Sequence, residues 1–359
     1  MNRTIKLRNK ELFLLIFFFI ILKLVIFFLS KIYTHQIFGG GNDANYYHAF
    51  AIGLDNYAVN LWPVFLRYLN DFSFYNREYI SVFLSFLAIF IIPFMIGKLS
   101  LIKTFSNKQY IILFLFLIIT IYPNIFFQSL DIYRDVFMLF IFLVGLFVVK
   151  DFLRRDILIK VLYFFIALSI AYLLFLFRPY LGFGFFVALL LTPFYSFKKY
   201  SLLLSVFLLL FLLQIAFLTE ILEPILKYRT IFETMKGGSN LGINFDSVTF
   251  FIPKFLQSFL YQMFGLYFIN MASILAFCIE TVPFFVALIY LIKNKKYSDK
   301  FVDFLILFFT IYGVVWLLGN DNLGTATRLR MFNYIVLYIA CFIVYQNKYI
   351  YQKYQKVYK

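Results

Sequence analysis

Charged residues are scarce in this chain of 359 residues. Only 14% of the residues are Asp, Glu, Lys or Arg, whereas 64% are hydrophobic and the mean hydropathy is +0.89. An ordinary soluble domain is about half apolar and about a quarter charged, so a chain of this composition could not cover its own surface in water. The composition excludes a soluble enzyme, a disordered segment and a secreted disulfide scaffold, and it indicates a polytopic membrane protein.

Metal-binding and nucleotide-binding motifs are missing from the sequence. There are two His and two Cys, and Cys278 and Cys341 both lie in apolar runs, where we expect them to pack as small hydrophobic residues. No H-x-x-x-H or C-x-x-C spacing occurs, so we predict no metal site. The chain also lacks a P-loop, a G-x-S-x-G motif and a dinucleotide fingerprint. We therefore expect no cofactor, and an activated substrate would have to arrive already made.

Long apolar runs fill most of the chain. A transmembrane helix needs roughly 20 mostly apolar residues, and the runs that approach this length lie near residues 12–32, 79–97, 110–128, 136–149, 157–177, 181–197, 201–218, 271–292, 301–319 and 331–345. No internal repeat and no matched pair of Gly- or Pro-broken runs is found. The predicted fold is an all-α polytopic integral membrane protein. It is a single transmembrane domain over residues 1–359, with about ten transmembrane helices and interfacial amphipathic helices on the outer face.

The few charges are distributed unevenly between the predicted loops. The formal net charge is +16, from 33 Lys+Arg and 17 Asp+Glu. With a cytoplasmic N-terminus, the cytoplasmic segments sum to +17 and the outside segments to −2, which is the positive-inside distribution. The basic leader 1–11 resembles a signal sequence, but the long apolar run after it lacks a clear cleavage site and indicates a retained anchor. The basicity therefore predicts a multi-pass topology with both termini in the cytoplasm, and no nucleic-acid partner.

Two sizeable segments are predicted outside, residues 33–78 and 219–270. The first opens with a flexible run of glycines, Gly39–Gly41, and continues into short interfacial helices. In the second, Gly237–Asn240 is expected to form a mobile hinge before an amphipathic helix. Polar residues in 248–269 follow the spacing of an amphipathic helix, which we expect to lie in the outer interface without crossing the membrane.

The type of cation differs between the two predicted sides. Cytoplasmic loops hold 17 Lys and 4 Arg, whereas the outside segments hold seven Arg and two Lys. A guanidinium suits planar, bidentate binding of phosphate or carboxylate, so the outside arginines suggest an anionic ligand. The candidate substrate-binding residues at the outer ends of spans are Arg134, Asp135, Arg178, Arg328 and Arg330. Alternatively, some of these arginines are interfacial anchors or ion-pair partners of Asp131, Asp135 and Asp321.

Glu280 lies in the middle of the predicted span 271–292 with no neighbouring charge. A carboxylate at that depth costs on the order of 2.5–3.5 kcal/mol and normally faces the bundle interior. We interpret Glu280 as a candidate catalytic residue. The alternatives are a structural partner of an arginine and a neutral, hydrogen-bonded acid.

Asp43 and His48 are the other candidate catalytic residues. They lie in the first outside segment, where Asp43, Tyr47 and His48 share one face of a predicted helix. A carboxylate and an imidazole beside arginines could supply a general base. Asp43 also stands near the start of that helix, so an ordinary N-cap explains it equally well.

Several short motifs carry a resemblance to a known family. They are Asp43-Ala44 with Tyr47, Asp131-Ile132-Tyr133-Arg134-Asp135 before a span, Arg178-Pro179-Tyr180 after one, Ile252–Leu256 at the start of the amphipathic segment, the span with Glu280, and Asn322–Arg330 before the last span. In this arrangement the chain resembles bacterial polysaccharide-locus membrane proteins, which are oligosaccharide repeat-unit polymerases or GT-C-like glycosyltransferases. It departs from many GT-C enzymes in having a single carboxylate, Asp43, in the first-loop motif.

The resemblance implies a membrane glycosyltransferase in the bacterial inner (cytoplasmic) membrane. Such a protein transfers or polymerises polyprenyl-pyrophosphate-linked glycan on the extracytoplasmic face, in the biosynthesis of O-antigen, capsule or exopolysaccharide. The four arginines would hold the pyrophosphate, and Asp43, His48 or Glu280 would deprotonate the acceptor. Expected partners are the lipid-linked glycan, membrane lipid and other polysaccharide-assembly proteins. The main alternative is a lipid-linked oligosaccharide flippase or another transporter, and the third is a non-catalytic assembly protein.

Overall fold

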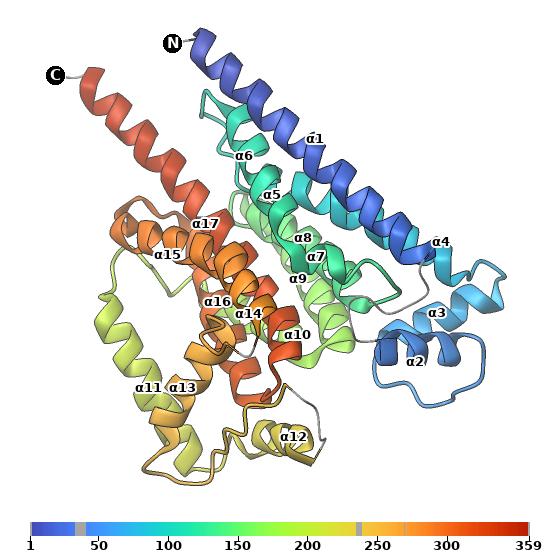
Figure 1. Ribbon diagram of the computed structural model, residues 1–359. Coiled ribbons are helices and arrows are strands. Elements are labelled where there is room, and N and C mark those ends of the chain that lie inside the picture. The colour runs from blue at the N-terminus through green and yellow to red at the C-terminus, as the bar shows by residue number, and fades with distance from the viewer. Residues whose placement is uncertain (1, 33–40, 235–238, 269, 358–359) are drawn as a thin grey trace. The chain divides into compact units, whose positions relative to one another are not determined.

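The computed structural model describes residues 2–32, 41–234, 239–268 and 270–357 (Figure 1). Within these ranges every regular element is a helix, and the extended pairing is one isolated antiparallel bridge between Asn240 and Asn322. The chain forms two compact units, Met1–Phe183 and Gly184–Lys359, called the first and second unit below. The all-helical prediction is confirmed for the described residues, and the single domain over residues 1–359 stays a prediction.

The first unit contains helices α1 to α9 and one π-helical turn, η1. Their bounds are α1 Asn2–Ile32, α2 Gly41–Ala51, α3 Leu61–Asp71, α4 Arg77–Phe86, η1 Leu87–Ile91, α5 Ile92–Leu99, α6 Lys108–Ile121, α7 Pro123–Phe127, α8 Arg134–Phe152 and α9 Ile157–Phe177. Helix α10, Pro179–Leu191, begins in the first unit and ends in the second.

The second unit continues with helices α11 to α17. Their bounds are α11 Leu202–Leu218, α12 Glu223–Thr234, α13 Phe251–Met263, α14 Met271–Ala276, the π-helical η2 Phe277–Thr281, α15 Val282–Lys293, the 3-10 helix η3 Lys295–Tyr297, α16 Lys300–Gly319 and α17 Leu323–Val357. Helices α16 and α17 form an antiparallel hairpin, in which the Tyr312 hydroxyl donates to the Leu329 carbonyl and the Trp316 indole donates to Asn333.

In the part of the chain that the structure describes, six helices are long and apolar enough to cross a membrane. They are Arg8–Ile32, Arg77–Leu99, Ile157–Phe177, Met271–Lys293, Lys300–Gly319 and Leu323–Gln355. A seventh span is possible if Leu202–Leu218 and Glu223–Ile231, which meet at a bend of 83°, count as one. The helices support a membrane protein, and the predicted number of ten spans stays a prediction beyond these six.

Helix length and charge account for the lower number. Helix α8 has 19 residues but carries Arg134, Asp135, Lys150 and Asp151 near its ends. The expected span 110–128 is interrupted because Tyr122 precedes Pro123 and has an extended ψ of 111°, so α6 ends at Ile121. Helix α10 has 13 residues and α11 has 17, which is less than the roughly 20 residues that a perpendicular crossing requires.

Two of the long helices contain a π-helical turn directly before a proline. Turn η1 leads into Ile92-Pro93, and turn η2 leads into Val282-Pro283. Proline lacks an N–H and clashes with the carbonyl of the preceding turn, and a widened π turn accommodates this defect without ending the helix. Glu280 lies in η2, so the proline sets the local backbone that presents this acid.

Several cations bind carbonyls at the ends of helices. Arg134 donates to the carbonyl of Phe177, the last residue of α9, at 3.0 Å. Lys150 donates to Leu101, just after α5, at 2.9 Å, and Lys300 donates to Tyr195, after α10, at 2.8 Å. The last carbonyls of a helix have no partner within it and carry partial negative charge. Arg134 therefore satisfies a helix end, and Lys150 and Lys300 satisfy carbonyls in the loops that follow helices α5 and α10.

Trp62 fixes α3 against the rest of the first unit. Its ring is 1% exposed and lies 5.2 Å from the Phe137 ring. Its indole nitrogen donates to the Ile132 carbonyl at 2.7 Å. The ring therefore fixes the first outside segment to the Asp131–Asp135 motif by packing and by one buried hydrogen bond.

We expect Trp62→Ala to lower the free energy of unfolding by about 3–5 kcal/mol, because it empties a buried aromatic site. Trp62→Phe should cost less, since it keeps most of the packing and leaves only the Ile132 carbonyl without its donor. The measurement is thermal unfolding in detergent. The control is Tyr68→Ala on the same helix, where the ring is 61% exposed. Equal losses for Trp62→Ala and Tyr68→Ala would contradict the assignment.

Candidate functional site

In the first unit Arg134, Asp135 and Arg178 lie together, and Arg178 is an ion-pair partner of Asp135, one of the alternatives considered for the outside arginines. The Arg178 Nη1 and Asp135 Oδ1 atoms lie 3.2 Å apart, and the two side chains are 5% and 0% exposed. Arg134 binds the Phe177 carbonyl next to Arg178. A buried guanidinium of this kind needs an opposite charge. Asp135 therefore neutralises Arg178, and an anionic ligand would have to share or replace that carboxylate.

A second polar cluster in this unit was not singled out from the sequence. Arg77, the first residue of α4, forms a two-pronged ion pair with Asp131: Nε donates to Oδ1 at 2.9 Å and Nη2 to Oδ2 at 2.6 Å. Nη2 also donates to Oδ1 of Asn45 on α2 at 2.9 Å. This fork is the geometry in which Arg binds carboxylates most strongly. It joins α2, α4 and the Asp131–Asp135 motif.

His48 belongs to the same cluster. Its Nδ1 lies 2.8 Å from the Tyr75 hydroxyl, and the two rings stack. Burial lowers the pKa of His48, and the positive charge of Arg77 lowers it further against the opposing effect of Asp131. Burial raises the pKa of Tyr75 to about 12, so its hydroxyl keeps its proton. His48 is therefore an uncharged imidazole at neutral pH, the form that a general base requires.

The ion pair also sets the charge of Asp131. Burial would raise the pKa of this carboxyl, but the hydrogen bonds from Arg77 and from the Ile132 backbone, together with the charge of Arg77, hold it below its usual value. Asp43 lies on the exposed side of the first turn of α2. The sequence held separate signals for this cluster, in His48, in Asp131 and in Arg77 as one of the seven predicted outside arginines, but nothing that joined them.

In the second unit Glu280 and Arg330 form a buried ion pair. Arg330 Nη2 donates to Glu280 Oε2 at 2.8 Å, and both side chains are 4% exposed. The Arg330 guanidinium also lies over the Tyr334 ring, at 5.6 Å from the centroid. Tyr334 in turn donates its hydroxyl to the Met263 carbonyl at 2.7 Å and contacts the Thr281 hydroxyl at 3.1 Å. The pair therefore connects the π turn of one span to the start of another.

Gly265 makes room for this pair. Its φ is +65°, and a Cβ added there would lie 2.6 Å from Nη1 of Arg330. Only glycine adopts such a backbone at no steric cost. The end of α13 and the guanidinium can therefore approach each other only because position 265 has no side chain.

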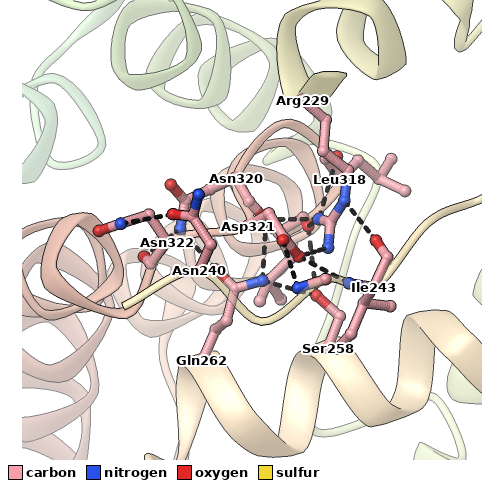
Figure 2. Close-up of polar contacts among 11 residues, drawn as sticks. Arg229, Asn240, Ile243, Ser258, Gln262, Leu318, Asn320, Asp321 and Asn322 are labelled. Carbon is pink, nitrogen blue, oxygen red and sulfur yellow. Dashed lines mark hydrogen bonds and ion pairs between the residues drawn. The ribbon is translucent and has the colours of Figure 1, made fainter. Parts of the chain in front are cut away.

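Arg229 and Asp321 form the most highly connected polar group in the second unit (Figure 2). Arg229 donates to Asp321, to the Ile243 carbonyl at 2.8 Å and to the Leu317 carbonyl at 3.1 Å. The second Asp321 oxygen accepts from the Gly242 backbone at 2.8 Å. Arg229 is 2% exposed and Asp321 is 0% exposed. Every charge in this group is thus matched by an opposite charge and by backbone dipoles.

Side-chain amides extend the Arg229 network to α13 and α17. Gln262 donates to the Asn320 carbonyl at 2.9 Å and to the Ser258 hydroxyl at 2.7 Å, and both residues are fully buried. The polar face of α13 therefore points into the protein at these two positions. The physical reason is that the Asn320 backbone and side chain and the Leu317 carbonyl offer hydrogen-bond partners that hydrocarbon does not.

The predicted hinge lies partly in this network. Asn322 donates to Ser239 Oγ at 2.8 Å and to Asn240 Oδ1 at 2.7 Å. Gly237 and Gly238 lie outside the described residues, as do Gly39 and Gly40 of the first outside segment. The described part of the expected hinge is therefore bound to the loop that precedes α17.

The predicted site residues thus form separate groups. Arg134, Asp135 and Arg178 lie together in the first unit, and Glu280 and Arg330 lie together in the second. Arg328 is half-buried on α17, two residues before Arg330. Within the described ranges, no group of three or more His, Cys, Asp or Glu side chains is placed to hold a metal ion. A comparison with protein families, curated proteins and solved structures finds no match for this chain.

We expect Arg229→Ala to be strongly destabilising, by about 3–5 kcal/mol, because it leaves Asp321 as an unpaired buried charge. The double variant Arg229→Ala with Asp321→Ala should recover part of that loss, since it removes both charges. Chemical or thermal unfolding in detergent measures both. Lys227→Ala is the control: it breaks the exposed Lys227–Glu223 pair on the same helix and should change little. A double variant no more stable than Arg229→Ala would argue against an ion pair.

Lowering the pH should destabilise the His48 cluster. The pKa of His48 in the folded protein lies below 6.5, so the unfolded chain binds the proton more readily. The stability that neutral His48 gives the folded state is therefore lost as the pH falls through and below 6.5. We expect the unfolding midpoint to drop more between pH 7.5 and 5.5 in the native protein than in His48→Gln. His35→Gln, which removes the other imidazole, is the control and should keep the dependence. The prediction would be refuted if the unfolding midpoint of His48→Gln fell with pH as steeply as that of the native protein.

Proposed function

We propose that this protein is a membrane glycosyltransferase that transfers or polymerises a polyprenyl-pyrophosphate-linked glycan. The observation that carries the proposal is the burial of acid–arginine pairs, Asp135–Arg178 and Glu280–Arg330, in apolar helical surroundings. Buried ionisable groups in membrane helices are expensive and are commonly functional. Arginine is the cation whose fork suits both carboxylate and phosphate. The resemblance of the surrounding motifs to polysaccharide-locus proteins supplies the substrate class.

The proposal includes a topology. The segments that carry these pairs face the extracytoplasmic side of a bacterial cytoplasmic membrane, and both termini face the cytoplasm. The positive-inside distribution of loop charges supports this orientation. Ten spans, with α2, α3 and α13 in or near the outer interface, complete the arrangement. The glycan then acts as substrate outside, while its lipid remains in the bilayer.

The arginines are proposed to bind the pyrophosphate by ligand exchange. Two of the four, Arg134 and Arg178, belong to the first unit, and Arg328 and Arg330 belong to the second. A phosphate oxygen can replace a carboxylate in the fork of a guanidinium. Pyrophosphate would therefore compete with Asp135 for Arg178 and with Glu280 for Arg330. As the bond between the sugar and the pyrophosphate breaks, its electron pair goes to the pyrophosphate oxygen, whose charge the arginines stabilise.

His48 is the preferred general base among the three candidates. The acceptor hydroxyl forms the new bond to the anomeric carbon and loses its proton to the base. A neutral imidazole accepts that proton readily near pH 7, and the contacts of His48 keep it neutral. Glu280 is already engaged by Arg330, which makes its carboxylate a weaker acceptor.

We expect Arg134→Lys, Arg178→Lys, Arg328→Lys and Arg330→Lys each to lower polymer formation, by roughly 100-fold at the most critical position, a scale typical of lost transition-state donors. The measurement is complementation of a deletion strain, with polymer length read on gels and lipid-linked intermediates read by mass spectrometry. Arg67→Lys is the control, because Arg67 binds the Asp55 carbonyl and stacks on Phe50. Membrane abundance of each variant separates misfolding from lost activity.

The deletion strain itself discriminates between the candidate functions. A polymerase or transferase defect leaves single lipid-linked repeats exposed on the outer leaflet. Accumulation confined to the cytoplasmic leaflet would instead identify a flippase, and full polymer formation by all four Lys variants would refute the anion-binding role of the arginines.

A further inference from the structure

An apolar cavity of about 250 Å³ lies within the second unit, among α11, α13, α15, α16 and α17. Along α16 its lining extends from Ile306 to Leu317, which is roughly 16 Å at 1.5 Å per residue. The lining side chains are almost all aliphatic or aromatic, with Thr310 as the one hydroxyl. The cavity is therefore long, narrow and suited to a hydrocarbon chain.

The cavity opens sideways between α11 and α13. Leu202, Val206 and Leu256 line it and are still 39%, 47% and 41% exposed. Helix α11 buries only Leu213 among its described residues, so the cavity is the space beneath a loosely packed apolar helix. An apolar space of this kind takes up apolar ligands and excludes water. In a membrane its mouth opens towards the acyl chains.

One end of the cavity is basic. Phe197 and Ile292 both line the cavity, and each is followed directly in sequence by an exposed lysine, Lys198 and Lys293. The two loops are joined at this end, because Lys295 donates to the Tyr200 carbonyl at 2.6 Å. Two cations therefore flank the place where the headgroup of a lipid in the cavity would lie. Lysines near a membrane surface attract anionic lipids.

We propose that this cavity binds one acyl chain of an anionic glycerophospholipid, whose phosphate lies between Lys198 and Lys293. The lipid fills the space under α11 and stabilises the packing of that helix on α13 and α16. Along α16 the lining ends at Leu317, whose carbonyl belongs to the Arg229 network. None of Arg134, Arg178, Arg328, Arg330 and Glu280 lines the cavity. The lipid site is thus distinct from the arginines of the proposed transfer reaction and does not depend on that proposal.

The test is a lipid titration of the detergent-purified full chain, followed by native mass spectrometry. Dioleoylphosphatidylglycerol is the anionic probe, and dioleoylphosphatidylcholine is the zwitterionic one. We expect one high-affinity anionic lipid per chain. In Lys198→Gln with Lys293→Gln, affinity for the anionic lipid should fall roughly 30-fold, at about tenfold per 1.4 kcal/mol and about 1 kcal/mol per lysine. Affinity for phosphatidylcholine should stay the same.

Two further variants complete the experiment. Val206→Trp, at the exposed mouth, should weaken both lipids by filling the cavity. Lys103→Gln with Lys353→Gln removes two exposed lysines elsewhere and should retain native affinity. Equal affinity of the native chain for both lipids, or equal loss in the two lysine pairs, would overturn the proposal. A different co-purifying lipid would also overturn it. That result would be an isoprenoid phosphate, in place of a glycerophospholipid, that is extracted from the native protein and is lost in Val206→Trp.

Discussion

The buried ion pair between Arg229 and Asp321 organises one end of the second unit. In surroundings this apolar, a charge is tolerated only with an opposite charge and with its remaining hydrogen-bonding groups satisfied. Arg229 meets this condition by binding Asp321 together with carbonyls at the end of α16, and Asp321 does so by accepting backbone N–H groups near Gly242. Four segments are fixed together as a result: α12, the strand-like segment 239–243, α13 and the loop before α17.

The position of Glu280 and Arg330 depends on that arrangement. Asn322 accepts from the Thr325 backbone at 2.9 Å and caps α17, so the network determines where α17 begins and which way Arg330 points. On the other side, the π turn before Pro283 presents Glu280. The Arg229–Asp321 pair lies at the start of α17, which carries Arg330, and Pro283 follows the π turn that carries Glu280. Gly265 leaves the space in which Glu280 and Arg330 form their contact.

The arginines of the predicted outside segments have two kinds of partner in this structure. Arg134 and Arg229 bind carbonyls at helix ends, where partial negative charge accumulates. Arg77, Arg178 and Arg330 bind carboxylates. An anionic substrate would therefore meet arginines that already hold acids, and its binding would be an exchange of one anion for another. The fork of a guanidinium makes such an exchange possible without a change in its position.

The sequence by itself determined the membrane class, the all-helical fold and the helix at α13. It also singled out Glu280 and the predicted outside arginines as candidate site residues. Hydropathy, helical spacing and isolated charges are local properties, so they can be read without coordinates. Only the tertiary structure decided which helices reach spanning length, that Gln262 faces inward, and which acid each arginine binds. Glu280 and Arg330 are 50 positions apart and Arg229 and Asp321 are 92 apart. Nothing in local spacing distinguishes such a partner from any other acid, because the choice depends on how distant helices pack.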